Sequence, residues 1–248
     1  MIKKFYIINL DKRKDRWENL NTIINSCSFN KENILRFSAI DGYNFSTEIN
    51  RLGLENNKFI QLFTKYKKIV RKNEFACFLS HSLVLEKISN DDDLNDDDYV
   101  GIFEDDWNLC VDFEKNYEIF KQINLSEYDM DILYLGGRFF KQFDKNIGNY
   151  IYFKNTNHPN LYERHYDINI PPILWDRTTC NYVVKKSACK KILSLLMEKI
   201  VHKWDAIDAF YNHLKYEDIK TFDFFPHLFY SVLNNESDIQ RNFEVIHF

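Results

Sequence analysis

The sequence has few of the residues that break regular structure and few that cross-link a chain. Its 248 residues include only 6 glycines and 4 prolines, against 22 phenylalanines and 15 tyrosines. This composition excludes collagen-like and low-complexity disordered chains and predicts a well-packed globular protein. The 5 cysteines are scattered, with no Cys-x-x-Cys pair. That argues against both a disulfide framework and a zinc site, and for reduced thiols in a cytoplasmic compartment.

The sequence also lacks a long apolar run and a strong net charge. No segment approaches ~18 consecutive apolar residues, so we expect no membrane-spanning segment. The amino terminus lacks the cleavage pattern of a secretory signal. We therefore expect a cytoplasmic protein, and attachment to a membrane surface stays open. The formal net charge of −4 argues against nucleic acid as a partner, because nucleic-acid-binding proteins carry basic surfaces. The oligomeric state stays open as well.

Apolar runs alternate with amphipathic segments along the chain, which predicts an α/β fold. Residues 5–10 predict a buried strand, residues 17–27 carry apolar side chains at helical spacing, and residues 34–39 predict a second strand. A strand, a helix and a strand within about forty residues are typical of the start of a parallel α/β sheet. We find no internal repeat and no flexible linker, so we expect one domain over residues 1–248.

Later segments of the chain extend this pattern. We expect Asn73 to cap one helix and Ser187 to cap another. The acidic run at 91–98 lacks the spacing of an EF-hand, and we expect a solvated, mobile loop there. Residues 154–172 are rich in Asn, His and Pro and predict a long irregular segment, of a kind that often binds ligands.

Three consecutive carboxylates, Glu104, Asp105 and Asp106, follow the apolar run at 99–103. Three like charges at the end of a buried strand repel one another unless a cation or hydrogen-bond donors lie between them. Ligands of open α/β sheets bind at the carboxyl ends of the strands. Taken alone, the stretch is compatible with a solvated acidic turn, and a divalent metal at the edge of a sheet is the alternative.

Six stretches occur in order over nearly the whole chain. They are residues 8–16 (INLDKRKDR), 39–42 (AIDG), 73–81 (NEFACFLSH), 103–106 (FEDD), 131–136 (DILYLG) and 182–184 (YVV). Together they resemble glycosyltransferase family 25, which includes bacterial lipooligosaccharide galactosyltransferases, collagen hydroxylysine galactosyltransferases and related viral enzymes. Each motif alone is weakly specific, but six in order are strongly specific. One departure is Asn73 where the family has glycine, and Asn also tolerates a left-handed backbone.

The resemblance implies a fold and a reaction. The implied fold is of the GT-A type, a Rossmann-like sheet that is mixed, mainly parallel and flanked by helices. The implied reaction moves a hexose, galactose or glucose, with inversion from a UDP-sugar to a hydroxyl of a glycan, a glycolipid or a hydroxylysine-type side chain. Manganese is the implied metal, and magnesium is the alternative. A hard divalent cation with carboxylate ligands suits this chemistry, because transfer develops negative charge on the leaving diphosphate.

With the family in view, individual residues become candidates. Asp106 is the first candidate metal ligand, and Asp105, Glu104 and Asp238 are the others. The candidate residues for binding the donor are Asn9, Leu10, Arg13, Arg16, Asp41, Gly42, Ser80, His81, Glu104 and Asp105. Arginine suits bidentate contact with phosphate, although Arg13 and Arg16 are also compatible with a salt-bridged first turn of a helix. His81 is also compatible with a packed, hydrogen-bonded histidine.

The candidate general base is Asp208, with Asp205 as the alternative. An inverting transfer needs a base that takes the proton of the acceptor hydroxyl. Residues 207–210 fit an acidic stretch of the family. Asp205 lies three residues before Asp208, where capping of a helix is another role for it.

Two other functions are compatible with these residues, and some aromatic side chains stay open. Acid-ended strands also occur in metal-dependent phosphoester hydrolases, although no predicted strand of the sequence ends in the D-x-D motif of an aspartyl nucleophile. A nucleotide-sugar-binding protein without catalysis is the other alternative. The sequence is compatible with two roles, stacking on a ligand or packing in the core, for Trp107, Trp175 and Trp204. His227, next to a proline, is a further candidate metal ligand.

Overall fold

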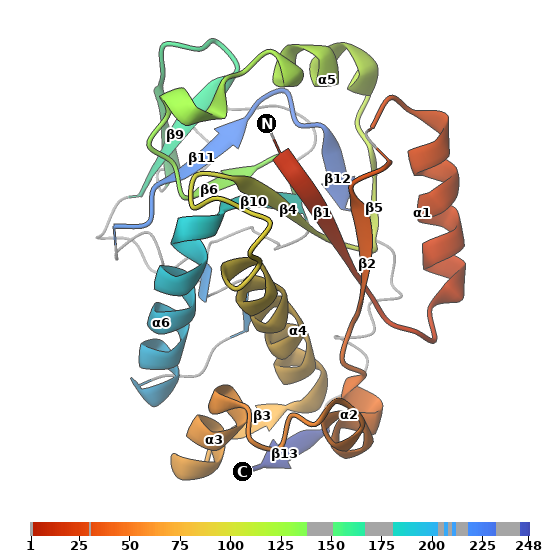
Figure 1. The fold of residues 1–248 in the computed structure, drawn as a ribbon, viewed down its shortest axis with the longest axis vertical. Helices are drawn as coiled ribbons and strands as arrows, with labels where there is room; N and C mark the ends of the chain where they lie inside the picture. The colour runs from red at the N-terminus through yellow and green to blue at the C-terminus, as the bar shows by residue number, and fades with distance from the viewer. Residues whose placement is uncertain are drawn as a thin grey trace.

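A central eight-stranded sheet has helices on both of its faces in the computed structural model (Figure 1). The structure describes residues 2–29, 31–137, 151–166, 181–202, 206–207, 210–211, 218–231 and 244–248. The strand order is β2-β1-β4-β10-β6-β11-β9-β8. Strands β9 and β10 run opposite to the other six, so the sheet is mixed and mainly parallel. The α/β fold class predicted from the sequence is confirmed.

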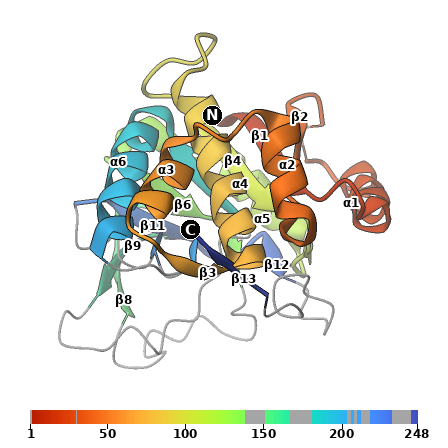
Figure 2. The ribbon, with the colours of Figure 1, turned by 90° about the horizontal axis from the view of Figure 1, so that it is seen from below.

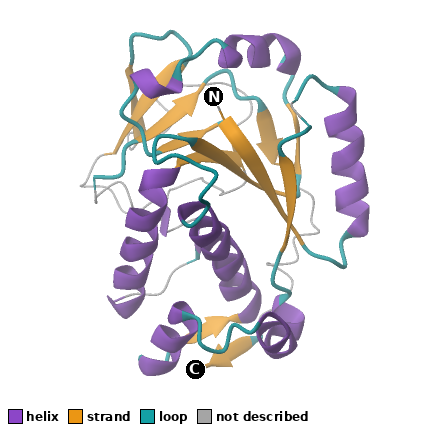
Figure 3. Cartoon of the chain, in the orientation of Figure 1, coloured by secondary structure: helices purple, strands orange, loops and turns teal. Residues whose placement is uncertain are grey.

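The elements alternate between strand and helix over much of the chain (Figure 3). The large sheet contains β1 (Ile2–Asn9), β2 (Ile34–Ser38), β4 (Tyr99–Glu104), β6 (Ile132–Tyr134), β8 (Ile151–Asn155), β9 (Leu161–Tyr166), β10 (Asn181–Lys185) and β11 (Thr221–Phe224). The helices are α1 (Lys14–Ser26), α2 (Phe45–Leu52), α3 (Lys58–Lys65), α4 (Lys72–Ser89), α5 (Phe113–Lys121) and α6 (Lys186–His202). Short 3-10 turns lie at Gly42–Asn44 and Leu125–Glu127. A three-stranded sheet contains β5 (Trp107–Leu109), β12 (Phe229–Ser231) and β7 (Gly136–Gly137), and a two-stranded one contains β3 (Ile69–Arg71) and β13 (Val245–His247).

Alternation along the buried strands divides the core into two layers. On β4, Val100 and Ile102 belong to the layer that includes α4 and α6, whereas Tyr99 and Phe103 belong to the layer that includes α1 and α5. Successive side chains of a strand point to opposite faces, and a strand covered on both faces is apolar throughout. Figure 2 shows α2, α3, α4 and α6 together on one side of the sheet. Each residue at the end of β4 therefore faces a different helical layer from its neighbour.

The last described residues lie against elements from the first third of the chain. Strand β13 pairs with β3, and the ring of Phe248 lies 5.4 Å from that of Phe63 and 5.0 Å from that of Phe75. Figure 1 shows the carboxyl terminus next to α3 and β3. The end of the chain thus contributes to the packing of the helical layer on the α4 side.

Two predicted helix caps are wrong, and the reason is the same for both. Helix α4 begins at Lys72, so Asn73 lies inside the first turn, and α6 begins at Lys186, so Ser187 does too. The amide of Lys72 donates to the carbonyl of Glu244, and that of Lys186 to the carbonyl of Asp98. The first amides of a helix need acceptors from outside it. Here distant backbone supplies acceptors, which the local sequence does not reveal.

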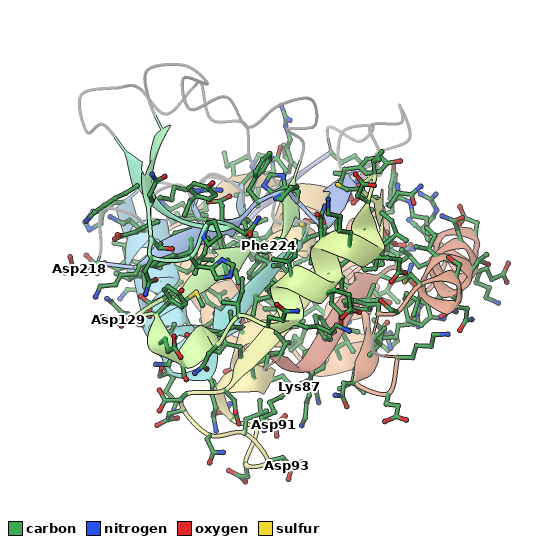
Figure 4. All side chains as sticks on the ribbon, turned by 90° about the horizontal axis from the view of Figure 1, so that it is seen from above. Lys87, Asp91, Asp93, Asp129, Asp218 and Phe224 are labelled. Atoms are coloured by element: carbon green, nitrogen blue, oxygen red, sulfur yellow. The ribbon has the colours of Figure 1, made fainter. Side chains whose placement is uncertain are left out.

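The acidic run at 91–98 is a mostly exposed loop, so the predicted solvent exposure is confirmed, and its mobility stays a prediction. Lys4 Nζ donates to Asp91 at 2.6 Å, and Lys186 Nζ donates to the carbonyls of Asp91 and Leu94 at 2.8 and 2.6 Å. Figure 4 shows Asp91 and Asp93 on this loop, which leads into the amino end of β4. The run therefore lies at the opposite end of β4 from the three consecutive carboxylates.

The segment predicted to be irregular at 154–172 is regular over much of its described part. Residues Ile151–Asn155 and Leu161–Tyr166 form the antiparallel strands β8 and β9. Residues 167–172 lie outside the described residues. The polar composition misled the prediction because β9 lies next to the edge strand β8, and its Tyr162 and Glu163 are only partly buried. Among the described helices, none combines the length and the apolar character that crossing a membrane requires.

Candidate active site

The three consecutive carboxylates lie at the carboxyl end of β4, next to the end of β1. Ile8 of β1 pairs with Glu104 in the parallel register of the two strands, and Asn9 is the next residue of β1. In sheets of this kind the loops after neighbouring parallel strands form the ligand site. The predicted convergence of residues 9–16 and 104–106 at one edge of the sheet is therefore present in the structure.

Asp105 is held by hydrogen bonds from two sides. Asn9 Nδ2 donates to Asp105 Oδ2 at 2.7 Å, and Arg16 Nη1 donates to Asp105 Oδ1 at 2.7 Å. Burial raises the pKa of Asp105, although Arg16 and Asn9 favour the ionised carboxylate and oppose that shift. Both carboxylate oxygens are thus engaged by the protein itself. This arrangement fixes the end of β4 to the beginning of α1.

Asn9 is the centre of this network, and Arg36 is a member that sequence analysis missed. The buried Asn9 accepts a hydrogen bond from Arg36 Nε at 2.8 Å and also donates to the carbonyl of Arg13 at 3.2 Å. Arg36 Nη2 donates to Asp11 at 2.8 Å, and Ser38 Oγ donates to the same carboxylate at 2.7 Å. The hydrogen bond from Ser38, with that from Arg36, holds the pKa of Asp11 below its usual value. The available signal was an arginine inside an otherwise apolar strand.

The turn that contains Asp41 and Gly42 lies against the loop after β1. Lys12 Nζ donates to Asp41 at 2.9 Å and lies 4.4 Å from the ring centroid of Tyr43. Gly42 is buried, and a Cβ at this position would lie 2.2 Å from Oδ1 of Asn73 and 2.7 Å from its Cα. Glycine is needed here because the turn touches the first turn of α4.

Two further predicted donor-binding residues are engaged within the protein. Ser80 Oγ accepts from the amide of Ile40 at 3.0 Å and donates to the carbonyl of Ala76 at 2.8 Å. The carbonyl of Leu10 accepts from the amide of Arg13 at 2.9 Å. Both contacts shape the backbone around the candidate site, and direct contact of these residues with a donor stays a prediction.

Four cationic side chains gather at the carboxyl ends of β1 and β2. Each makes an ion pair with a carboxylate: Lys12 with Asp41, Arg13 with Asp15, Arg16 with Asp105, and Arg36 with Asp11. Among the four carboxylates, Asp15 has the most exposed side chain. Arg13 donates two hydrogen bonds to it, and they lower the pKa of Asp15 to about 2. An anionic ligand at this edge would meet guanidinium groups already oriented by the protein.

Glu104 and Asp106 have different surroundings from Asp105. Glu104 lies on the α4 side of the sheet, where its Oε1 is 3.4 Å from Nε2 of the buried His81. Asp106 lies between β4 and β5 and is partly exposed. Its carboxylate, at the edge where the cationic side chains gather, has the chemistry of a ligand for a hard divalent cation. The three acids therefore differ in their surroundings, because alternating side chains of a strand face different layers.

Trp107 belongs to the core, so its stacking on a ligand is excluded. It is 1% exposed, and its ring centroid lies 5.9 Å from that of Phe103 and 4.9 Å from that of Phe229. On the neighbouring strand β12, Ser231 pairs with Trp107. His227 precedes β12 and is partly buried, with its ring 5.8 Å from that of Phe225. Its assignment as a metal ligand stays a prediction.

The two candidate bases, Asp205 and Asp208, lie outside the described residues, and so do Asp238, Trp175 and Trp204. Residues close to the two candidate bases are described and buried. Phe210 packs against Phe78 of α4 with ring centroids 5.6 Å apart, and the hydroxyl of Tyr211 lies 2.9 Å from that of Tyr182. Ile207, Phe210 and Tyr211 thus belong to the α4 layer, on the same face of the sheet as Glu104.

Comparison with known proteins gives one strong match. Residues 2–210 match the family described as Glycosyltransferase family 25 (LPS biosynthesis protein). No protein with a curated function matches the chain. One solved structure, a putative glucose-1-phosphate thymidylyltransferase from Bacillus anthracis in complex with a sucrose, aligns over 89% of this chain and 86% of its own, with 11% identity and a TM-score of 0.36. That likeness is too weak to bear on function. The family match covers all six motifs and the three consecutive carboxylates, and the chain therefore belongs to glycosyltransferase family 25 and is a glycosyltransferase.

Proposed function

We propose that this glycosyltransferase moves a hexose, galactose or glucose, with inversion from a UDP-sugar to a hydroxyl of a glycan, in a metal-dependent reaction. The observation that carries the proposal is the contact between Arg16 and Asp105. It brings the cationic segment after β1 next to Asp106, the carboxylate that suits a hard cation. A diphosphate needs both kinds of group at one place.

The donor is expected to lie along the carboxyl ends of β1 and β4. Arg13 is the first candidate for direct contact with phosphate, because its present partner Asp15 has a side chain that is 65% exposed and can be displaced. Arg16 and Asn9 hold Asp105, so they are expected to act chiefly by fixing the end of β4. Asp41 and Gly42 form the turn on the other side of the loop.

A divalent cation, manganese with magnesium as the alternative, would neutralise the charge that develops on the leaving diphosphate. Asp106 is the proposed ligand, with Asp238 as a second one from the carboxyl-terminal part of the chain. Glu104 is less suited to this role because His81 lies near its carboxylate. Asp105 is less suited because two hydrogen bonds engage its carboxylate. Carboxylate oxygens are the ligands that both metals prefer.

The acceptor hydroxyl would attack the anomeric carbon as the bond to the diphosphate breaks, and its proton would pass to Asp208. Asp205 is the alternative base. This assignment of the base is supported by Ile207 and Phe210, which lie on either side of Asp208 in the sequence. Both are buried in the α4 layer that also faces Glu104. The family description as an LPS biosynthesis protein favours a saccharide acceptor, free or lipid-linked, over a hydroxylysine-type side chain.

The experiment is a thermal-shift screen of UDP-sugars with manganese, with magnesium and with EDTA, followed by transfer to an array of saccharide acceptors. A donor raises the melting temperature because it binds only the folded protein. We expect Asp106→Asn to lose the manganese-dependent part of the shift. Asp208→Asn should keep that shift and lower turnover by about 10²–10⁴-fold. The anomeric configuration of the product, read by NMR, tests inversion.

A matched control is Asp112→Asn. Asp112 is exposed and has a left-handed backbone, with φ of 62°, that Asn also tolerates. This variant should behave as the wild type in binding and turnover. The metal assignment is overturned if Asp106→Asn keeps both the shift and the transfer. UDP-sugar binding without transfer to any acceptor would instead indicate a binding protein that has lost catalysis.

A further inference from the structure

A thiol, an imidazole and a carboxylate meet on the α4 side of the candidate site. Cys77 and His81 lie one turn apart on α4, and Glu104 is the last residue of β4. One ligand atom from each, Cys77 Sγ, a ring nitrogen of His81 and a carboxylate oxygen of Glu104, lies within 4.8 Å of the others. Cys77 and Glu104 are partly exposed, whereas His81 is fully buried. Solvent can therefore reach the group from the side of Cys77 and Glu104, and the protein covers it on the side of His81.

The hydrogen bonds of His81 leave one ring nitrogen directed at this group. Nδ1 lies 3.1 Å from the hydroxyl of Tyr182, which lies 2.9 Å from the hydroxyl of Tyr211. Burial raises the pKa of Tyr182 and of Tyr211 well above the usual value, so both hydroxyls stay protonated. Tyr182 can then donate to Tyr211 and accept from Nδ1–H. With the proton on Nδ1, the imidazole presents its Nε2 lone pair, the form that binds a metal.

The other nitrogen, Nε2, is buried and makes no hydrogen bond with any residue that the structure describes. It faces Oε1 of Glu104 at 3.4 Å. With the proton on Nδ1, Nε2 and Oε1 are both acceptors, and a cation between them would remove their repulsion. A buried polar atom without a hydrogen bond requires an explanation, and a bound ion is one.

We propose that Cys77, His81 and Glu104 form a binding site for Zn²⁺, separate from the hard-cation site at Asp106. Two ligands about 2.0–2.1 Å from a tetrahedral zinc lie about 3.3–3.4 Å apart, which matches the separation of Nε2 and Oε1. Thiolate and imidazole ligands favour zinc over manganese and magnesium. Three protein ligands leave the fourth position open to water or a small ligand.

The surroundings support a built site. The hydrogen bond between Nδ1 and the hydroxyl of Tyr182 is the kind of outer contact that fixes the ring of a zinc-bound histidine. Zinc here would fasten the middle of α4 to the end of β4, next to Asp105 and Asp106. The sequence argued against zinc because it has no Cys-x-x-Cys pair, but these ligands come from one helix and one strand. The proposal does not rest on the identity of the sugar donor.

The test uses the full-length protein, stripped with EDTA and then dialysed against Zn²⁺ alone, with bound zinc measured by elemental analysis. We expect one tightly bound zinc per chain in the wild type. Cys77→Ser and His81→Gln should each weaken zinc binding by at least about 10–100-fold, the loss typical of even an outer partner of a metal site. Cys27→Ser is the matched control, because Cys27 is another partly exposed thiol, at the end of α1. It should bind zinc as the wild type does.

Two further measurements use the wild-type protein and therefore do not depend on whether a variant folds. Zinc should protect Cys77 from alkylation by iodoacetamide, as mapped by mass spectrometry, and should leave Cys27 unprotected. Co²⁺ in place of zinc should give the charge-transfer absorption of a thiolate ligand. Equal alkylation of Cys77 with and without zinc, or zinc binding in Cys77→Ser equal to that of the wild type, would overturn the proposal. Asp106→Asn should still bind zinc, so failure of this site and failure of the proposed manganese site are distinguishable.

Discussion

Asn9 donates a hydrogen bond of 2.7 Å to Asp105, and this contact ties the end of β1 to the end of β4 across 96 positions of sequence. Asn9 is 1% exposed, and its side-chain oxygen accepts from Arg36. Its amide therefore joins three segments of the sheet edge at which the candidate site lies. An amide is suited to this position because it donates to a carboxylate and accepts from a guanidinium at the same time.

Replacing Asn9 by Ala should destabilise the protein by about 1–3 kcal/mol, because the largely buried carboxylate of Asp105 loses a hydrogen-bond donor and the exposed Arg36 loses an acceptor. The measurement is urea-induced unfolding followed by circular dichroism. Asn25→Ala is the control, since Asn25 is exposed on α1 and its loss should change stability by no more than about 0.5 kcal/mol. Equal midpoints for the two variants would contradict the role assigned to Asn9.

Asp105→Asn should change how stability depends on pH. Because burial raises the folded-state pKa of Asp105 above its usual value of 3.8, its contribution is fully present below that value and is lost as pH rises through the raised pKa. Asn does not titrate. The unfolding free energy of the variant minus that of the wild type should therefore become more positive as pH rises through this window. Urea titrations over a pH series, in EDTA, measure the difference.

Asp15→Asn should show the opposite sign in the same experiment. The pKa of Asp15 is lowered to about 2 by its hydrogen bonds with Arg13, so its contribution is present above 3.8 and is lost as pH falls towards 2. The variant-minus-wild-type difference should become more negative as pH rises. The effect is expected only at low salt, because the carboxylate is exposed and screened. Differences of the same sign for the two variants would contradict one of the two assignments.

Gly42→Ala should be destabilising, and Gly137→Ala should not. A Cβ at Gly42 would lie 2.7 Å from the Cα of Asn73, a backbone atom that cannot move aside without shifting α4. Overpacking of this kind typically costs about 1–3 kcal/mol. A Cβ at Gly137 would meet nothing within 4 Å among the residues that the structure describes. Thermal unfolding of both variants tests this, and equal melting temperatures would show that the turn and α4 can separate.

The order and type of most elements could be predicted because they depend on local patterns. The strand at 5–10 corresponds to β1, Ile2–Asn9, and the helix at 17–27 to α1, Lys14–Ser26. The helix caps could not be predicted, because the carbonyl of Glu244 bonds the first amide of α4 from 172 positions away. A tertiary acceptor leaves no trace in the sequence next to the helix.

The site was predicted in outline, and its internal arrangement was not. The convergence of residues 9–16 with 104–106 followed from motif order and from the strand ends. That Glu104 and Asp105 face different layers was available from strand alternation, but three adjacent acids suggested one shared ligand. Arg36 escaped notice because its partners, Asn9 and Asp11, lie on another strand and its loop. Which carboxylate binds metal stays a prediction.

Arg164 and Asp223 form a buried ion pair between β9 and β11, with side chains that are 6% and 3% exposed. The guanidinium also lies 4.6 Å from the ring centroid of Tyr134. Arg164→Met alone should destabilise the protein by about 3–5 kcal/mol, because it leaves the carboxylate of Asp223 buried without its counter-charge. Adding Asp223→Leu removes that charge, so the double variant should be more stable than Arg164→Met. A urea double-mutant cycle measures the coupling, and strictly additive losses would mean that the two charges act independently.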